Sequence, residues 1–126
     1  MLLFDGGSQG NPGKGYGSFL VILPDGSERR RQVSFRGSVT NNQAEYRALI
    51  GGLKFLHRLL GERVGQVHLE VRGDSRLVVE QVQGRWKTTS PELRALRDRA
   101  QELLAPFGSR SFVHVPREEV VRQLGH

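Results

Sequence analysis

Cysteine is absent from this 126-residue sequence, which excludes a disulfide framework and any metal site built from thiolates. The sequence also lacks any apolar run near the roughly 18 residues that a membrane-spanning helix requires. The opening Met1-Leu2-Leu3-Phe4 meets Asp5 too early for a signal peptide. We therefore expect a cytoplasmic protein with no membrane partner.

Acidic residues are scarce relative to basic ones. The chain carries 13 Asp and Glu against 19 Lys and Arg, which gives a formal net charge of +6. This balance argues against a metal-storage role and makes polyanions the expected partners. Hydrophobic residues make up 37% of the chain, and no repeat, low-complexity segment or linker interrupts it. Residues 1–126 are thus expected to form one domain, taken as a monomer because nothing indicates a protein partner.

Glycine, in contrast, is plentiful near the start. Leu2-Leu3-Phe4 predicts a short buried strand ending at Asp5, and the glycines from Gly6 to Gly17 predict a flexible loop with a turn at Asn11-Pro12. Neither common phosphate-binding glycine motif fits this loop. A P-loop would need Ser or Thr where Gly15 stands, and no G-x-G-x-x-G dinucleotide fingerprint can be aligned.

Hydrophobic periodicity and turn residues predict the elements that follow. In chain order they are a strand over 18–23, a hairpin turn at 25–26, a strand over 29–35, a helix over 42–60, and a strand from 67 that stops at Gly73-Asp74-Ser75. A short helix over 77–82, a helix that starts at Ser90-Pro91-Glu92 and runs towards 106, a strand over 111–115 and a short final helix follow. We interpret Arg29-Arg30-Arg31 as a solvated strand edge. This order predicts a mixed α/β sheet.

Three carboxylates occupy positions that such a sheet would bring together. Asp5 and Asp74 are expected at the ends of neighbouring strands, and Glu45 in the first turn of the long helix, where Asn42 is the predicted N-cap. Clustered carboxylates cannot all remain ionised without a cation, because like charges raise one another's pKa values. Oxygen ligands without cysteine favour Mg²⁺ or Mn²⁺ over zinc. In the alternative interpretation, Glu45 only completes a capping box, Asp5 starts a turn and Asp74 caps a helix.

Five runs of residues, in order and spread over nearly the whole chain, form a further pattern. They are Phe4 to Ser8, Gly10 to Gly13, Thr40 to Leu49, Gly73 to Val79 and His114 to Glu118. Together they resemble type 1 ribonuclease H, most closely its short prokaryotic branch without a separate hybrid-binding domain. The resemblance implies the ribonuclease H-like fold, a five-stranded mixed sheet flanked by helices. It also implies an endonuclease that cleaves the RNA strand of RNA–DNA hybrids with two metal ions.

The resemblance also implies roles for individual positions. Asp5, Glu45 and Asp74 match three of the family's four catalytic, metal-binding carboxylates. The positions that would contact nucleic acid are Thr40 at a DNA phosphate, Asn41 and Asn42 in the minor groove, and Trp86 with Arg85 and Lys87 near the DNA channel. Packing between helices is the alternative interpretation of Trp86. His114 is interpreted as structural.

The final helix departs from the family pattern at the catalytic site itself. Aligning the run that begins at Pro116 puts Leu124 where the family has its fourth metal-binding Asp. Three carboxylates would leave one positive charge of two Mg²⁺ ions for the scissile phosphate to balance. We therefore expect one firmly bound ion, a second weaker one, and impaired cleavage; the alternative function is a non-catalytic module that binds hybrids or duplexes. The candidate substitutes for the missing ligand are Glu118, Glu119, His126 and the terminal carboxylate.

Overall fold

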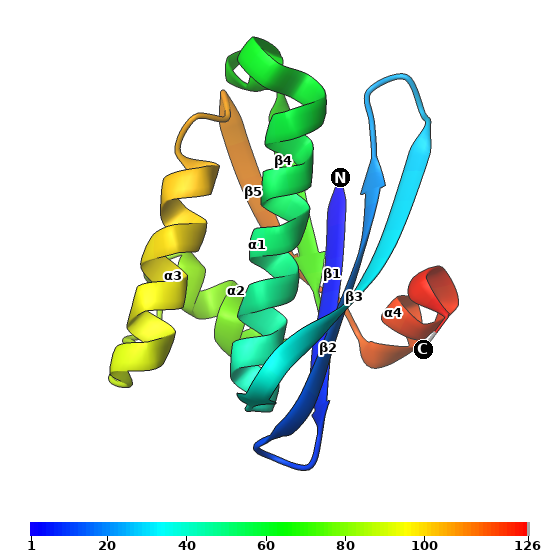
Figure 1. Cartoon of the computed structure of the whole chain (residues 1–126). Coiled ribbons are helices and arrows are strands. Elements are labelled where there is room, and N and C mark those ends of the chain that lie inside the picture. The colour runs from blue at the N-terminus through cyan, green and yellow to red at the C-terminus, as the bar shows by residue number, and fades with distance from the viewer. Residues whose placement is uncertain (126) are drawn as a thin grey trace.

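The computed structural model describes residues 1–125 and arranges them as one sheet with helices on both faces (Figure 1). The strands are β1 (Leu2–Gln9), β2 (Gly13–Ile22), β3 (Glu28–Val39), β4 (His68–Gly73) and β5 (Ser109–His114). The helices are α1 (Asn41–Leu60), the 3₁₀ helix η1 (Gly61–Gln66), α2 (Arg76–Val82), α3 (Pro91–Leu104) and α4 (Arg117–Leu124).

The sheet is mixed and five-stranded, as expected, with the order β3-β2-β1-β4-β5. β1, β2 and β3 are antiparallel neighbours, whereas β4 runs parallel to β1 and β5 parallel to β4. The register of β1 on β4 pairs Phe4 with Gly73. The residues that follow this pair, Asp5 and Asp74, therefore lie on adjoining strands.

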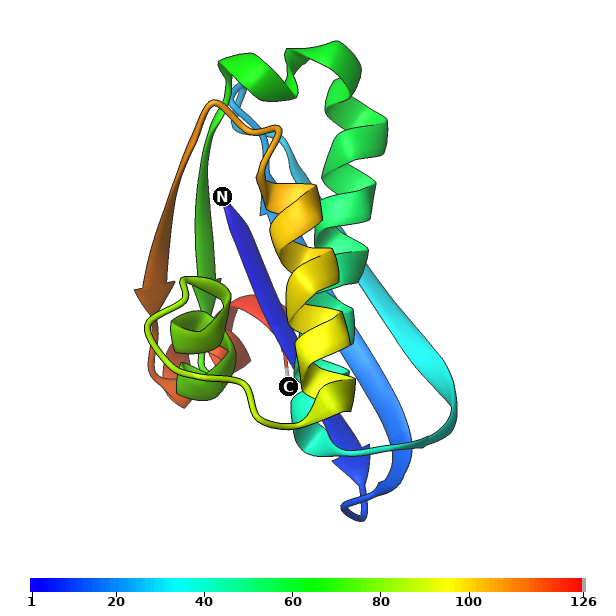
Figure 2. The ribbon, with the colours of Figure 1, turned by 90° about the vertical axis from the view of Figure 1, so that its left-hand side faces the viewer.

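The sheet separates two apolar clusters. Helices α1, α2 and α3 cover one face and α4 the other, so Figure 2 looks onto the three helices with the sheet behind them. The larger cluster joins α1 and α3 to the sheet and includes Phe4 and Tyr46. The smaller cluster, under α4, consists of Leu3, Leu20, Val115 and Val120. Because successive strand residues point to opposite faces, Phe4 faces α1, whereas Leu3 and Asp5 face α4.

The glycine-rich segment from Gly6 to Gly17 forms a β-hairpin, so the prediction of a flexible loop is wrong. β1 continues past Asp5 to Gln9 and pairs with β2 along its whole length, so Asp5 lies inside a strand and not at its end. Glycine here permits close approach of another backbone. A Cβ atom on Gly6 would lie 2.3 Å from the Ala44 carbonyl oxygen of α1. The absence of a side chain at Gly6 thus lets α1 rest directly on β1.

The start of α1 also differs from the prediction. The helix begins at Asn41, and Thr40 is its N-cap in place of Asn42. The Thr40 hydroxyl accepts a hydrogen bond from the Gln43 N–H at 3.1 Å, and the Gln43 side chain accepts one from the Thr40 N–H at 2.9 Å. Gln43 therefore completes the capping box. The capping interpretation of Glu45 is wrong, and its carboxylate is left for tertiary contacts.

Several local predictions are confirmed. β4 stops at Gly73, α3 has Ser90 as N-cap and Pro91 in its first turn, and α4 spans eight residues. Arg29-Arg30-Arg31 lies exposed on the edge strand β3. Among residues 1–125, no helix combines the length and apolarity needed to cross a membrane.

Candidate metal and nucleic-acid site

Three carboxylates from three elements meet at one end of the sheet. Asp5 comes from β1, Asp74 directly follows β4, and Glu45 comes from the second turn of α1. One oxygen of each lies within 4.8 Å of the others, and this is the only such group of His, Cys, Asp or Glu residues found among residues 1–125. The structure thus brings together the three residues that the sequence singled out. They line an open hollow of about 320 Å³.

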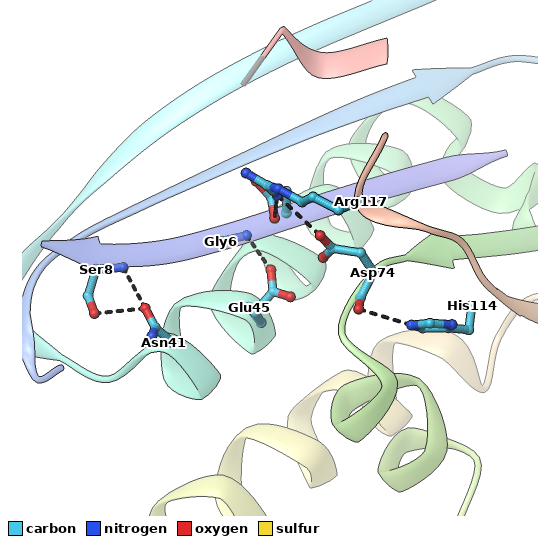
Figure 3. A network of polar contacts seen from close by, with 8 residues as sticks. Gly6, Ser8, Asn41, Glu45, Asp74, His114 and Arg117 are labelled. Atoms are coloured by element: carbon cyan, nitrogen blue, oxygen red, sulfur yellow. Dashed lines mark hydrogen bonds and ion pairs between the residues drawn. The ribbon is translucent and has the colours of Figure 1, made fainter. Parts of the chain in front are cut away.

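Burial and like charge determine the protonation of Glu45. Its carboxylate accepts a hydrogen bond from the Gly6 N–H, a contact made possible by the close approach of α1 to β1 (Figure 3). Burial, followed by the negative charges of Asp5 and Asp74, raises the pKa of Glu45 to about 9. At neutral pH, without a cation, Glu45 therefore keeps its proton and hydrogen-bonds to Asp5.

One guanidinium group contacts two of the three acids. Arg117, the first residue of α4, donates a hydrogen bond from Nη1 to Asp5 at 3.0 Å. The same Nη1 donates to Asp74 at 3.2 Å (Figure 3). Tyr16 lines the same hollow, and burial followed by the Asp5 charge raises the pKa of its phenol. The sequence reasoning assigned no site role to either residue. The signal for Arg117 was present in the run from His114 to Glu118.

His114 fixes the backbone beside the cluster. Its Nε2–H donates to the Asp74 carbonyl oxygen at 3.0 Å, so it lies outside the carboxylate group and holds the segment that carries Asp74. This geometry agrees with its structural interpretation.

The donor set suits a hard divalent cation. The residues supply carboxylate oxygens, two of them from buried side chains, and oxygen ligands are those that Mg²⁺ and Mn²⁺ prefer. After burial, the negative charges of Asp5 and Asp74 also contribute to the raised pKa of Glu45, and a bound cation would offset them. Arg117 supplies only one positive charge to three acidic groups. The cluster thus fits a metal ion bound by Asp5, Glu45 and Asp74.

The first turn of α1 is fastened to the β1–β2 hairpin. The Asn41 side-chain oxygen accepts hydrogen bonds from the Ser8 N–H at 2.9 Å and from the Ser8 hydroxyl at 3.0 Å (Figure 3). In return, the Asn41 N–H donates to the Asn11 side-chain oxygen at 3.1 Å. Ser8 and Asn11 were missed as positioning residues, although both lie in the runs that carried the family resemblance.

The other predicted nucleic-acid contacts lie around this helix start. Asn41 and Asn42 are exposed and line the carboxylate hollow. Thr40 and Asn42 also line a second hollow of about 490 Å³, which reaches Ser90 at the start of α3. Because the Thr40 hydroxyl already caps α1, a phosphate there would have to share it.

Arg85, Trp86 and Lys87 lie apart from the carboxylates, on the turn after α2. None of them lines the carboxylate hollow. Trp86 is 44% exposed and belongs to neither apolar cluster, so it is not part of the core packing. Arg85 forms an ion pair with Glu80 at 3.7 Å.

Leu124, aligned with the family's fourth Asp, ends α4 and packs against the smaller apolar cluster. Of the candidate substitutes, Glu118 and Glu119 are not members of the three-carboxylate group. Glu119 instead pairs with Arg122 and Gln123. His126 and the terminal carboxylate lie outside the described residues.

Comparisons with known proteins identify the family to which the chain is similar. The family described as reverse transcriptase-like matches residues 3–122. Ribonuclease HI of Halobacterium salinarum is 43% identical over 114 residues, which cover 90% of this chain and 55% of that protein. The bifunctional protein Rv2228c of Mycobacterium tuberculosis is 41% identical over 114 residues, which cover 90% of this chain and 30% of that protein. The chain thus spans about half and about a third of these two relatives.

Solved structures show the same fold. RNase H1 from Halobacterium salinarum superposes with a TM-score of 0.83 at 40% identity, covering 94% of this chain and 86% of that one. LC11-RNase H1 in complex with an RNA/DNA hybrid superposes with a TM-score of 0.86 at 32% identity, covering 98% and 91%. Because the family match spans nearly all of the chain and the architecture agrees, the chain belongs to the ribonuclease H family, in its small prokaryotic type.

Proposed function

We propose that this protein is a metal-dependent endonuclease that hydrolyses the RNA strand of RNA–DNA hybrids. The observation that carries the proposal is the meeting of Asp5, Glu45 and Asp74 within 4.8 Å in an open hollow beside the exposed start of α1. Two relatives support it by name, as ribonuclease HI and as an RNase H1 in complex with an RNA/DNA hybrid. The expected cytoplasmic location and monomeric state belong to the same proposal.

Asp5, Glu45 and Asp74 would hold Mg²⁺ or Mn²⁺. Bound divalent ions supply an activated water and neutralise charge that develops on the leaving oxygen. The chain's own part begins with Glu45, which must give up its proton to become a ligand. Arg117 would then exchange its contacts with Asp5 and Asp74 for a contact with the substrate phosphate.

Substrate recognition would fall to the residues around α1. Asn41 and Asn42 line the hollow, where their side-chain amides could donate to 2′-hydroxyls in the minor groove of a hybrid. Thr40 would contact a DNA phosphate. Trp86, with Arg85 and Lys87, would contact the DNA strand by stacking and charge. The exposure of Trp86 supports this assignment.

A test compares cleavage of an end-labelled hybrid by the parent and by Asp74→Asn in Mg²⁺ and in Mn²⁺. A lost ligand removes several kcal/mol of charge stabilisation, so the cleavage rate should fall on the order of a thousandfold. Asp98→Asn is the matched control, since Asp98 is exposed on α3 and pairs with Arg97. Cleavage that survives Asp74→Asn or chelation of the metal would contradict the proposal.

The second candidate function is a non-catalytic module that binds hybrids or duplexes. It is favoured by Leu124, which provides no fourth carboxylate, and by Arg117, which already bridges two of the three acids. In that case the parent would shift a labelled hybrid in a gel but leave it uncut at every metal concentration.

A further inference from the structure

Four exposed cations lie on α1 and β3, and together we call them the cationic face: Arg31, Arg47, Lys54 and Arg58. Residues 47, 54 and 58 fall on one side of α1 because their spacings are seven and four. Arg31 pairs with Phe19 across β2–β3, so its side chain points to the face of the sheet that α1 covers. α1 and the cyan strand β3 follow one margin of the molecule in Figure 2.

Two aromatic rings hold parts of this surface in place. The Arg31 guanidinium lies over the Phe55 ring of α1, 4.9 Å from its centroid. The Arg47 guanidinium lies over the Phe35 ring of β3, 5.6 Å from its centroid. Each contact joins the helix to the strand. An arginine supported in this way loses less side-chain freedom when it binds an anion.

The positive charge of the cationic face is not neutralised by the protein. Within the described part of the chain, none of the four residues forms an ion pair with a carboxylate. The neighbouring Arg30, on the opposite face of β3, does so with Glu28 at 3.5 Å. α1 itself contains one acid, Glu45, which is buried. Protection of a strand edge from aggregation does not require unpaired charges, because cations that pair with carboxylates would protect it equally well.

The cationic face extends away from the carboxylate site. Arg47 and Arg58 are eleven residues apart, which corresponds to about 16 Å along a helix. A duplex carries one charge per roughly 1.7 Å of its axis, so this length matches about ten phosphates. The residues that line the carboxylate hollow include none of the four cations.

We propose that the cationic face binds the phosphate backbone of a nucleic-acid segment that lies outside the carboxylate hollow. The inference rests on the proposed function only in assuming a nucleic-acid partner, and it does not require cleavage. The face would lengthen the footprint on a long hybrid, or hold a strand that continues beyond the hybrid.

The test measures binding of a labelled long hybrid in EDTA, where no cleavage occurs, as a function of salt. The variant Arg31→Gln/Lys54→Gln/Arg58→Gln should lower the slope of log Kd against log salt by about 2 to 3, since each lost phosphate contact contributes about 0.9. The matched control is Arg30→Gln/Arg99→Gln/Arg122→Gln, which removes the same charge from residues that pair with carboxylates. The slope for this control variant should change by less than half as much as the slope for the cationic-face variant.

Equal slopes for the two triple variants would overturn the proposal. Binding to phosphatidylserine vesicles is measured in parallel as a second anionic surface. If the cationic-face variant loses binding to these vesicles but binds the hybrid as the parent does, the proposal is also overturned. Cleavage of a short hybrid, measured in parallel with Mg²⁺, should have the same rate in the cationic-face variant and the parent. Failure of the parent to cleave would count against the proposed function, and the salt slopes would still decide the role of the cationic face.

Discussion

The protonation of Glu45 links the site to the pH dependence of folding stability. It is buried, it faces Asp5 and Asp74, and its pKa is raised to about 9 by burial first and by those two charges second. The unfolded chain would bind the same proton with the ordinary pKa of 4.5. Between these values the folded state holds a proton that the unfolded state releases.

For metal-free protein in EDTA, the Glu45 contribution to stability should be complete below pH 4.5 and lost as pH rises through about 9. The unfolding temperature should therefore decline over this range. Glu45→Gln, which stays neutral, should flatten the decline, whereas Glu62→Gln, at an exposed position of η1, should not. Thermal melts at a series of pH values provide the measurement. Parallel curves for Glu45→Gln and the parent would show that Glu45 holds no proton in the folded state.

Among the elements, α1 connects the carboxylate site to the turn that carries Trp86. Tyr46, next to Glu45, is fully buried and donates from its hydroxyl to the Gln81 side-chain oxygen at 2.8 Å. The Gln81 amide donates in turn to the Lys87 carbonyl oxygen at 3.3 Å. A chain of hydrogen bonds thus runs from α1 through α2 to the turn.

Tyr46→Phe should loosen this turn while the rest of α1 stays in place. Removal of the hydroxyl leaves the Gln81 oxygen without its donor, at a cost of about 1–3 kcal/mol. Because Trp86 is the one tryptophan of the sequence, its fluorescence anisotropy reports on the turn directly and should fall. Affinity for a hybrid should fall with it, and kcat should not.

Ile50→Val is the matched control, since it lowers stability by about 0.5–1.5 kcal/mol at a buried position of the same helix. Equal Trp86 anisotropy in Tyr46→Phe and Ile50→Val would mean that the Tyr46–Gln81 contact does not position the turn.

Elements governed by local rules could be predicted from the sequence, and those governed by tertiary contacts could not. Apolar spacing located α1, and Ser90-Pro91 located the start of α3. The glycine-rich hairpin was predicted as a loop because glycine freedom is visible in a sequence, whereas the close approach of Ala44 to Gly6 is not. The N-cap of α1 was predicted at Asn42 in place of Thr40, because both residue types are good N-caps and the sequence does not distinguish them.

At the scale of the whole molecule, the site was predictable only in part. Asp5, Glu45 and Asp74 could be predicted because each stands in a distinctive local setting. Arg117 was not predicted as their partner, although it stands in the run from His114 to Glu118, because its contact with Asp5 depends on the packing of α4 on the far face of the sheet.

The position of α4 also bears on Leu124. α4 covers the face of β1 that carries Leu3, and alternation puts the Asp5 side chain on that same face. Leu124 packs against the cluster that contains Leu3. A carboxylate at position 124 would therefore enter on the side of the sheet to which Asp5 points. This geometry is compatible with the alignment of Leu124 to the fourth metal ligand.

Leu124→Asp should accordingly lower the Mg²⁺ or Mn²⁺ concentration that gives half-maximal hybrid cleavage, because a fourth negative charge would compensate a second ion. It should also destabilise the fold by about 1–3 kcal/mol, since a polar group replaces apolar packing. Leu124→Asn has the same shape and the same loss of packing without the charge, so it separates the two effects. Metal titrations of cleavage, with thermal melts in parallel, provide the measurement. If Leu124→Asp and Leu124→Asn require the same metal concentration, then the missing charge at position 124 does not limit metal binding, and three carboxylates are sufficient for this protein.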